Sequence, residues 1–157
     1  MNRPLKPTSM SVVLVTGANR GIGLELVRQM LDQGHTVHAT YRTSKGGLEA
    51  LACSALHCHR MDVRNPDEVA SVIGAISTPI DVLVNNAGVA DGRWSSLSDI
   101  DFNVVSDVLE INAVAPVRVT QAALPLLVDG GGVVAMITSL MGSIEDCMSG
   151  RSYAYRA

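Results

Sequence analysis

Three closely spaced glycines could bind the phosphates of a nucleotide. Gly17, Gly21 and Gly23 follow an apolar run, Val12–Val15, and a helical pattern starts directly after them. A strand, a tight turn and a helix in this order direct free backbone N–H groups and the positive end of a helix dipole at one point, which suits a pyrophosphate. The spacing G-x-x-x-G-x-G differs from the usual G-x-G-x-x-G, and a plain strand-to-helix connection would also explain it.

The remainder of the chain alternates apolar runs with segments of helical periodicity. We expect strands at 11–16, 36–41, 56–61, 80–84 and 133–138, and helices after residue 21, at 44–53, from Pro66, and over about 102–128. Alternation of this kind predicts an α/β fold, with right-handed crossovers, a doubly wound parallel sheet and helices on both faces. Ligands of such sheets bind beyond the carboxyl ends of the strands.

Two helical segments carry further local signals. Asn65 precedes Pro66 and two acidic residues, as is typical of a capped helix start. Within the long segment 102–128, Pro116 lacks an N–H donor, so we expect it to bend the helix.

Composition limits the classes of function. The 157 residues are 47% hydrophobic and 17% charged, which fits one globular domain over 11–157 after a loose leader at 1–10. The net charge of −3 argues against nucleic-acid binding. No apolar run has the length of a membrane span. The three cysteines and four histidines lack metal-ligand spacing, and an odd cysteine count fits a reducing, cytoplasmic compartment.

An ordered set of motifs makes the chain resemble the short-chain dehydrogenase/reductase family, whose fold is of the Rossmann type. The motifs are Thr16-Gly17-x-x-x-Gly21-Ile22-Gly23, Asp62-Val63, Asn85-Asn86-Ala87-Gly88, Asn112, Ser139 and Tyr155. Within the family, the stretches 141–144 and 153–157 resemble the C-factor and sniffer-type carbonyl reductases.

The resemblance implies a nicotinamide nucleotide as cofactor. The turn with Asn19, Arg20 and Ile22 would hold its phosphates, Asp62 and the Val63 backbone its adenine, and the run Asn86-Ala87-Gly88 its ribose. Alternatively, Asp62 caps the next turn and the asparagine-rich turn is an ordinary loop.

Two arginines favour one form of this cofactor. The second strand ends at Arg42 without an acidic residue to bind the ribose 2′-hydroxyl of NAD, whereas Arg20 and Arg42 would accommodate the 2′-phosphate of NADP. We therefore predict NADP(H) rather than NAD, the alternative being that both arginines are solvated surface residues.

The resemblance also implies the chemistry, which is hydride transfer to or from a small-molecule carbonyl or alcohol. Tyr155 would be the general acid/base, Ser139 would hydrogen-bond the substrate carbonyl, and Asn112 would join a proton-relay water. Ser143 is the alternative serine and Tyr153 the alternative tyrosine. Alternatively, Ser139 caps a turn and Tyr155 packs on the surface, without a role in catalysis.

The family's lysine, four residues after Tyr155, would fall after Ala157. We therefore expect a form truncated at its C-terminus, with C-terminal strands missing, activity impaired and the apolar fifth strand left at a sheet edge. A homodimer through the helix at 102–128 is expected. The alternative function is a non-catalytic nucleotide-binding fragment or an interaction protein.

Overall fold

The computed structural model describes residues 10–91, 94, 96–129, 131–147 and 151–157, so almost all of the predicted leader lies outside the described residues. The strands are β1 Val12–Val15, β2 Thr36–Tyr41, β3 Leu56–Arg60, β4 Val82–Asn85 and β5 Val133–Met136. The α-helices are α1 Gly21–Asp32, α2 Pro66–Gly74, α3 Phe102–Leu109, α4 Ala115–Ala123 and α5 Tyr153–Arg156. Short 3₁₀ turns are η1 Gly46–Leu51, η2 Leu97–Asp99, η4 Leu124–Leu126 and η5 Leu140–Gly142, and η3 Glu110–Val114 is a π-helical turn.

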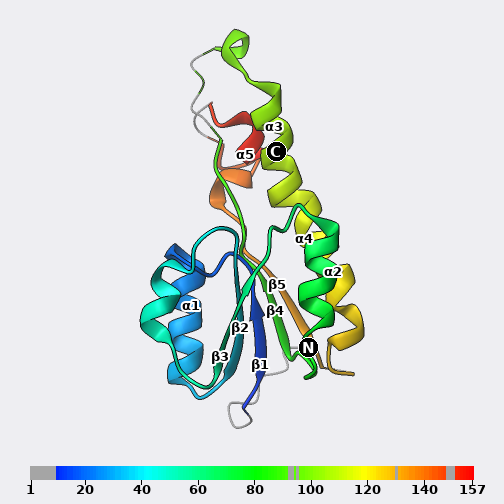
Figure 1. Cartoon of the computed structure of the whole chain (residues 1–157). Helices are drawn as coiled ribbons and strands as arrows, with labels where there is room; N and C mark the ends of the chain where they lie inside the picture. Colours follow the sequence, from blue (N-terminus) through cyan, green and yellow to red (C-terminus); the bar gives the residue numbers. More distant parts are fainter. Residues whose placement is uncertain (1–9, 92–93, 95, 130, 148–150) are drawn as a thin grey trace.

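The five strands form one parallel sheet in the order β3-β2-β1-β4-β5 (Figure 1). In its register Val13 lies opposite Val37 on one side and Val82 on the other. The order reverses between β1 and β4, so the helices that follow these two strands cover opposite faces of the sheet, and a crevice forms at the carboxyl edge. The predicted doubly wound parallel sheet is confirmed.

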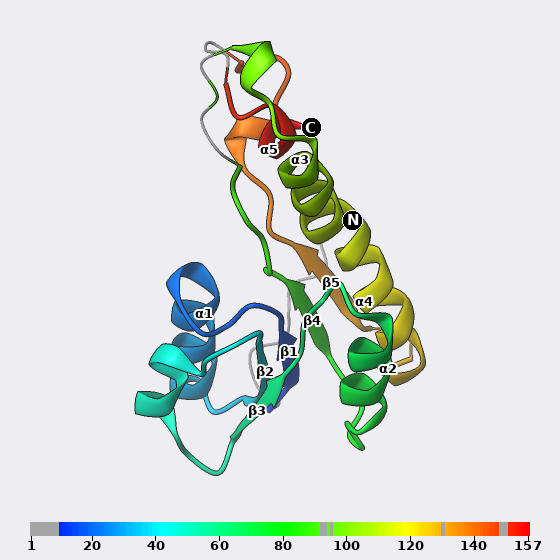
Figure 2. The ribbon, with the colours of Figure 1, turned by 45° about the horizontal axis from the view of Figure 1, so that its top comes forward.

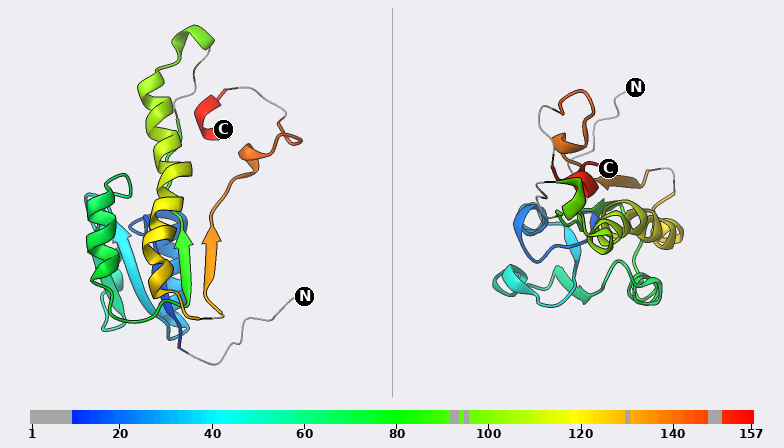
Figure 3. Two further views of the ribbon diagram at one scale, coloured as in Figure 1. Left: turned by 90° about the vertical axis from the view of Figure 1, so that its right-hand side faces the viewer. Right: turned by 90° about the horizontal axis from the view of Figure 1, so that it is seen from above.

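Helices cover both faces of the sheet (Figures 2 and 3). On one face Leu14 packs with Ile73 of α2 and Val119 of α4, and all three are almost fully buried. On the other face Val13 belongs to a cluster with Val27 of α1. Burying an aliphatic side chain of this size stabilises a fold by about 1.5–3 kcal/mol, so these two aliphatic layers hold the strand ends in place.

The predicted start of α2 is confirmed in detail. Oδ1 of Asn65 accepts the N–H groups of Asp67 at 3.0 Å and Glu68 at 3.2 Å, and Pro66 occupies the first helical position. A cap of this kind contributes about 1 kcal/mol.

The predicted helix over 102–128 is a composite of α3, η3, α4 and η4. The π-helical turn η3 lies just before Pro116, which has no N–H to return to the preceding turn. The interruption at this proline is therefore a change of helix type. This helix exposes two apolar side chains, Val114 at 47% and Val117 at 65%. Such side chains are compatible with the expected homodimer, which stays a prediction.

The bounds of four strands differ from the prediction, most clearly those of β4 and β5. β4 runs from Val82 to Asn85, because Ile80 forms only an isolated bridge to Leu127. β5 ends at Met136, two residues before the predicted end. Among the described residues β5 pairs only with β4, so it is an edge strand, as expected.

None of the described helices has the length and hydropathy that crossing a lipid bilayer requires.

Candidate functional site

A cavity of about 1330 Å³ lies beyond the carboxyl ends of the strands, at the crevice of the sheet. Residues that follow each of the five strands line it, together with residues of the long helix and of α5. Figure 3 shows α3 and α5 beyond this edge of the sheet. Every residue predicted from sequence for the site lines the cavity except Gly23.

The glycine turn joins β1 to α1 at one wall of the cavity. Gly17 and Gly21 have φ values of +62° and +56°, which side chains with a Cβ rarely adopt. At the start of α1 no side chain caps the helix, and its first turn contains no acidic residue. Because Arg20, Gly21 and Ile22 are exposed, the uncapped N–H groups of this helix end are open to an anion.

The loop after β4 is bound to the glycine turn. Nδ2 of Asn86 donates to the carbonyl oxygens of Thr16 at 2.9 Å and Gly17 at 3.0 Å. The hydroxyl of Thr16 accepts the N–H groups of Asn86 and Ala87, each at 3.0 Å. Gly23 lies behind this junction, since a Cβ there would collide with Nδ2 of Asn86. Its role in the structure is close packing, and it does not line the cavity.

Asp62 follows β3 and is held by Arg64. Nη2 of Arg64 donates to Oδ2 at 2.7 Å, and Nε and the backbone N–H of Arg64 donate to Oδ1 at 3.1 and 3.0 Å. These hydrogen bonds from Arg64 lower the pKa of the Asp62 carboxyl below its usual value. The carboxylate caps the next turn, as the alternative interpretation had it, and it also lines the cavity.

Positive charge dominates the described lining of the cavity. Arg20, Arg42 and Arg156 line it, whereas Asp62 is the acidic residue among its described lining residues. Arg20 and Arg42 are exposed side chains at the mouths of the turns after β1 and β2. This balance favours an anionic ligand.

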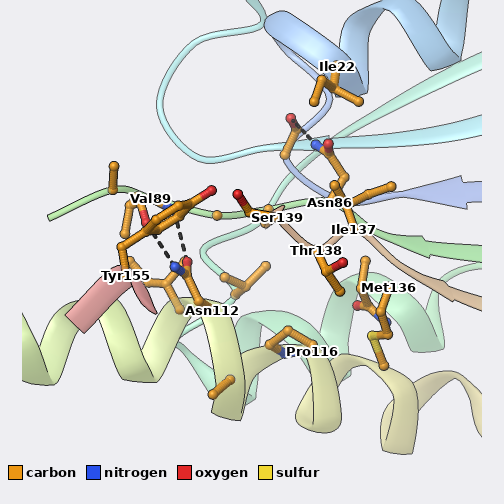
Figure 4. Close-up of a pocket in the computed structure, with 18 of the residues that line it drawn as sticks. Ile22, Asn86, Val89, Asn112, Pro116, Met136, Ile137, Thr138, Ser139 and Tyr155 are labelled. Atoms are coloured by element: carbon orange, nitrogen blue, oxygen red, sulfur yellow. Dashed lines mark hydrogen bonds between the residues drawn. The ribbon is translucent and has the colours of Figure 1, made fainter. Parts of the chain in front are cut away.

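Asn112 lies in the π-helical turn η3 and faces the loop after β4 (Figure 4). Its Oδ1 accepts the N–H of Val89 at 2.9 Å, and its Nδ2 donates to the carbonyl of Val89 at 2.8 Å. The amide is thereby fixed against the cavity wall.

Ser139 and Tyr155 reach the same cavity as Asn112 from separate elements (Figure 4). Ser139 comes three residues after β5, and its Oγ accepts the N–H of Met141 at 3.2 Å, so it caps the turn η5. Tyr155 belongs to the short helix α5. Ser143 also lines the cavity, with its hydroxyl donating to Asp146 at 2.8 Å, whereas Tyr153 is not among the lining residues.

Several residues that build the site were not assigned a role from sequence. Thr16 joins two loops, Val89 holds Asn112, and Asp91 accepts the N–H of Ala154 at 3.0 Å. Asn85 is buried, with Nδ2 donating to Thr120 at 3.0 Å. A polar residue at the end of a buried strand was the signal available for Thr16 and Asn85, but it does not identify the partner.

The residues fit a dinucleotide. Open helix N–H groups and three arginines suit phosphates. The cavity exceeds the volume of about 300–1,000 Å³ typical of small-ligand sites. Among the described residues, no group of three or more His, Cys, Asp or Glu side chains could hold a metal ion.

Comparisons with known proteins agree with this arrangement. Residues 11–154 match the family model described as short chain dehydrogenase. Over 79 residues, half of this chain and 47% of the relative, the chain is 48% identical to C-signal of Myxococcus xanthus. This similarity is in line with the C-factor resemblance seen in the sequence.

Two solved carbonyl reductases have a similar structure. The NADPH-bound carbonyl reductase from chicken fatty liver has a TM-score of 0.82 at 30% identity, covering 94% of this chain and 68% of the other. A carbonyl reductase from Pseudomonas aeruginosa PAO1 has a TM-score of 0.84 at 31% identity, covering 94% and 67%. The chain spans about half the length of the curated relatives it matches first.

Proposed function

This chain belongs to the short-chain dehydrogenase family, and we propose that it is an NADP(H)-dependent oxidoreductase acting on a small-molecule carbonyl or alcohol. One observation carries the proposal. Asn112, Ser139 and Tyr155 come from three separate elements and line the same cavity as the open glycine turn. A nucleotide anchored at that turn would extend toward these three side chains.

The three side chains have complementary roles in this proposal. Ser139 uses a lone pair to accept the Met141 N–H, so its O–H hydrogen is free to donate to a carbonyl oxygen of the substrate. Tyr155 would give a proton to that oxygen during reduction and take it back during oxidation. Asn112 holds the cavity wall through Val89. A bound nicotinamide would supply or accept the hydride.

Cofactor choice rests on charge. Arg42 follows β2 and Arg20 lies in the glycine turn, and both line the cavity. A 2′-phosphate carries more negative charge than a 2′-hydroxyl, so two arginines favour NADP(H) over NAD(H). The bound cofactor named for the chicken carbonyl reductase, NADPH, is in line with this proposal.

A second candidate is nucleotide binding without turnover. One observation favours it: the open glycine turn, Arg20 and Arg42 would hold a nucleotide without any contribution from Ser139 or Tyr155. A free phenol has a pKa of about 10, so proton transfer near neutral pH needs a neighbouring group that lowers it.

A single pair of assays separates the two candidates. NADPH binding is measured by the change in nucleotide fluorescence, and turnover by NADPH oxidation with a panel of aldehydes and ketones. The oxidoreductase proposal expects binding and turnover, with turnover lost in Tyr155→Phe and kept in Tyr153→Phe as the matched control. Binding without turnover supports the second candidate, and the absence of both refutes the two together.

A further inference from the structure

The helix that carries Tyr155 lacks a cap of its own. α5 is four residues long and starts after Ser152, whose backbone is left-handed with φ +52° and whose side chain makes no capping hydrogen bond. The first N–H groups of a helix need partners outside the helix. A buried helix start such as this one, where Ala154 is 4% exposed, therefore depends on another segment.

Asp91 provides that partner from 63 residues earlier in the chain. Its Oδ2 accepts the N–H of Ala154 at 3.0 Å, directly before Tyr155. Its Oδ1 is buried and has no hydrogen-bond partner among the described residues. Burying a carboxylate oxygen without a partner costs free energy. The hydrogen bond that Asp91 accepts from α5 offsets part of this cost.

The same short loop also holds Asn112. Val89 exchanges two hydrogen bonds with the Asn112 side chain, and Asp91 follows two residues later. Through these hydrogen bonds, the segment 89–91 contacts both the π-helical turn of the long helix and the first turn of α5. Asp91 does not line the cavity, so it acts through α5 and does not touch a ligand.

We propose that Asp91 is a positioning residue for Tyr155, which it holds over the cavity by capping α5 from the loop after β4. The inference rests on the proposed function, because it takes Tyr155 to be the group that moves the proton. α5 has a second anchor, since Nη1 of Arg156 donates to the carbonyl of Met141 at 3.2 Å. Removal of the Asp91 carboxylate therefore leaves the helix attached at its other end.

The direct test is hydrogen exchange of the Ala154 amide, followed by NMR in the 157-residue chain. Asp91→Ala removes the acceptor and is expected to speed this exchange about tenfold, whereas Asp91→Asn keeps an oxygen acceptor and the original protection. Asn65→Ala, which removes the cap of α2, controls for a general loss of stability and leaves the Ala154 amide unchanged. Equal protection of Ala154 in Asp91→Ala and the unsubstituted chain would overturn the inference.

Kinetics give the second readout. Asp91→Ala is expected to lower kcat about tenfold or more with KM for NADPH unchanged, and Asp91→Asn to restore it. An unchanged kcat in Asp91→Ala, or no recovery of kcat in Asp91→Asn, would contradict a role through Tyr155. Absence of turnover in the unsubstituted chain would count against the proposed function alone, since the exchange experiment does not need activity.

Discussion

Gly17 and Gly21 offer the sharpest prediction about how the nucleotide turn is built. Both have left-handed backbones, but only Gly17 is crowded: its Cβ would lie 2.7 Å from Cα and 3.1 Å from Cβ of Ala87, whereas a Cβ at Gly21 would meet nothing within 4 Å. Gly21→Ala therefore tests backbone strain alone, and Gly17→Ala tests strain together with a steric collision.

The expected costs follow from the two effects. An L side chain in the left-handed region costs about 1–2 kcal/mol, which is the whole cost at Gly21. Carbon atoms normally approach to about 3.5–4.0 Å, so Ala87 would have to retreat, although its N–H is bound to Thr16. Overpacking adds about 1–3 kcal/mol, so Gly17→Ala should cost about 3 kcal/mol or more in total.

Urea denaturation measures both variants, with Gly74→Ala as the control. Gly74 ends α2, its added Cβ would meet nothing within 4 Å and its φ is not left-handed, so alanine should be neutral or stabilise by about 0.5 kcal/mol. The expected order of unfolding free energies is Gly74→Ala, then Gly21→Ala, then Gly17→Ala as the least stable. If Gly17→Ala is as stable as Gly21→Ala, the contact between the turn and the loop after β4 is refuted.

Three further predictions concern other parts of the site and sheet. Thr16→Val leaves the N–H groups of Asn86 and Ala87 without their acceptor and should lower the free energy of unfolding by about 3 kcal/mol in urea denaturation. Thr16→Ser keeps the hydroxyl and should cost about 1 kcal/mol, so equal costs would contradict the role of the hydroxyl as the shared acceptor. His38 is buried and stacks on His57 and His59. Its burial, followed by the two neighbouring histidines, lowers the pKa of His38 to about 4. Between about pH 6.5 and 4 the unfolded chain therefore binds more protons than the folded chain, so the free energy of unfolding should fall by up to about 3 kcal/mol as the pH drops through this interval. His38→Gln should flatten that decline in thermal melts at several pH values, and an unchanged slope would rule out His38 as its source. Arg42→Ala should weaken NADPH binding about tenfold and leave NADH binding within about twofold, as measured by fluorescence titration; equal weakening of both would remove the charge argument for NADP(H).

Sequence pattern was sufficient to predict the sheet, most directly at β1 and β5, which are short apolar runs between turn residues. Ligands of parallel sheets bind beyond the carboxyl ends of the strands, so Asp62, Asn86 and Ser139 could be expected at one edge, and all three line the cavity. Strand ends were less predictable. β5 stops at Met136 although the apolar run continues through Ile137, because pairing with β4 ends where Asn85 ends β4.

The contacts inside the site could not be predicted, because they join residues far apart in the chain. Asn86 could be identified as a polar residue after a strand, but only the fold shows that its Nδ2 donates to the carbonyl oxygens of Thr16 and Gly17. Likewise, Asp91 has no sequence signal that links it to Ala154, and Pro116 marked an interrupted helix without indicating a π-helical turn.

The central claim is that the carboxyl ends of the strands form one nicotinamide-nucleotide site at the glycine turn. Titration of the 157-residue chain with NADPH, followed by nucleotide fluorescence and repeated for Gly17→Val, tests it most directly. The account predicts saturable binding at one site per chain, which the variant loses while Gly74→Ala keeps it. The absence of saturable binding, or equal binding by folded Gly17→Val, would contradict it.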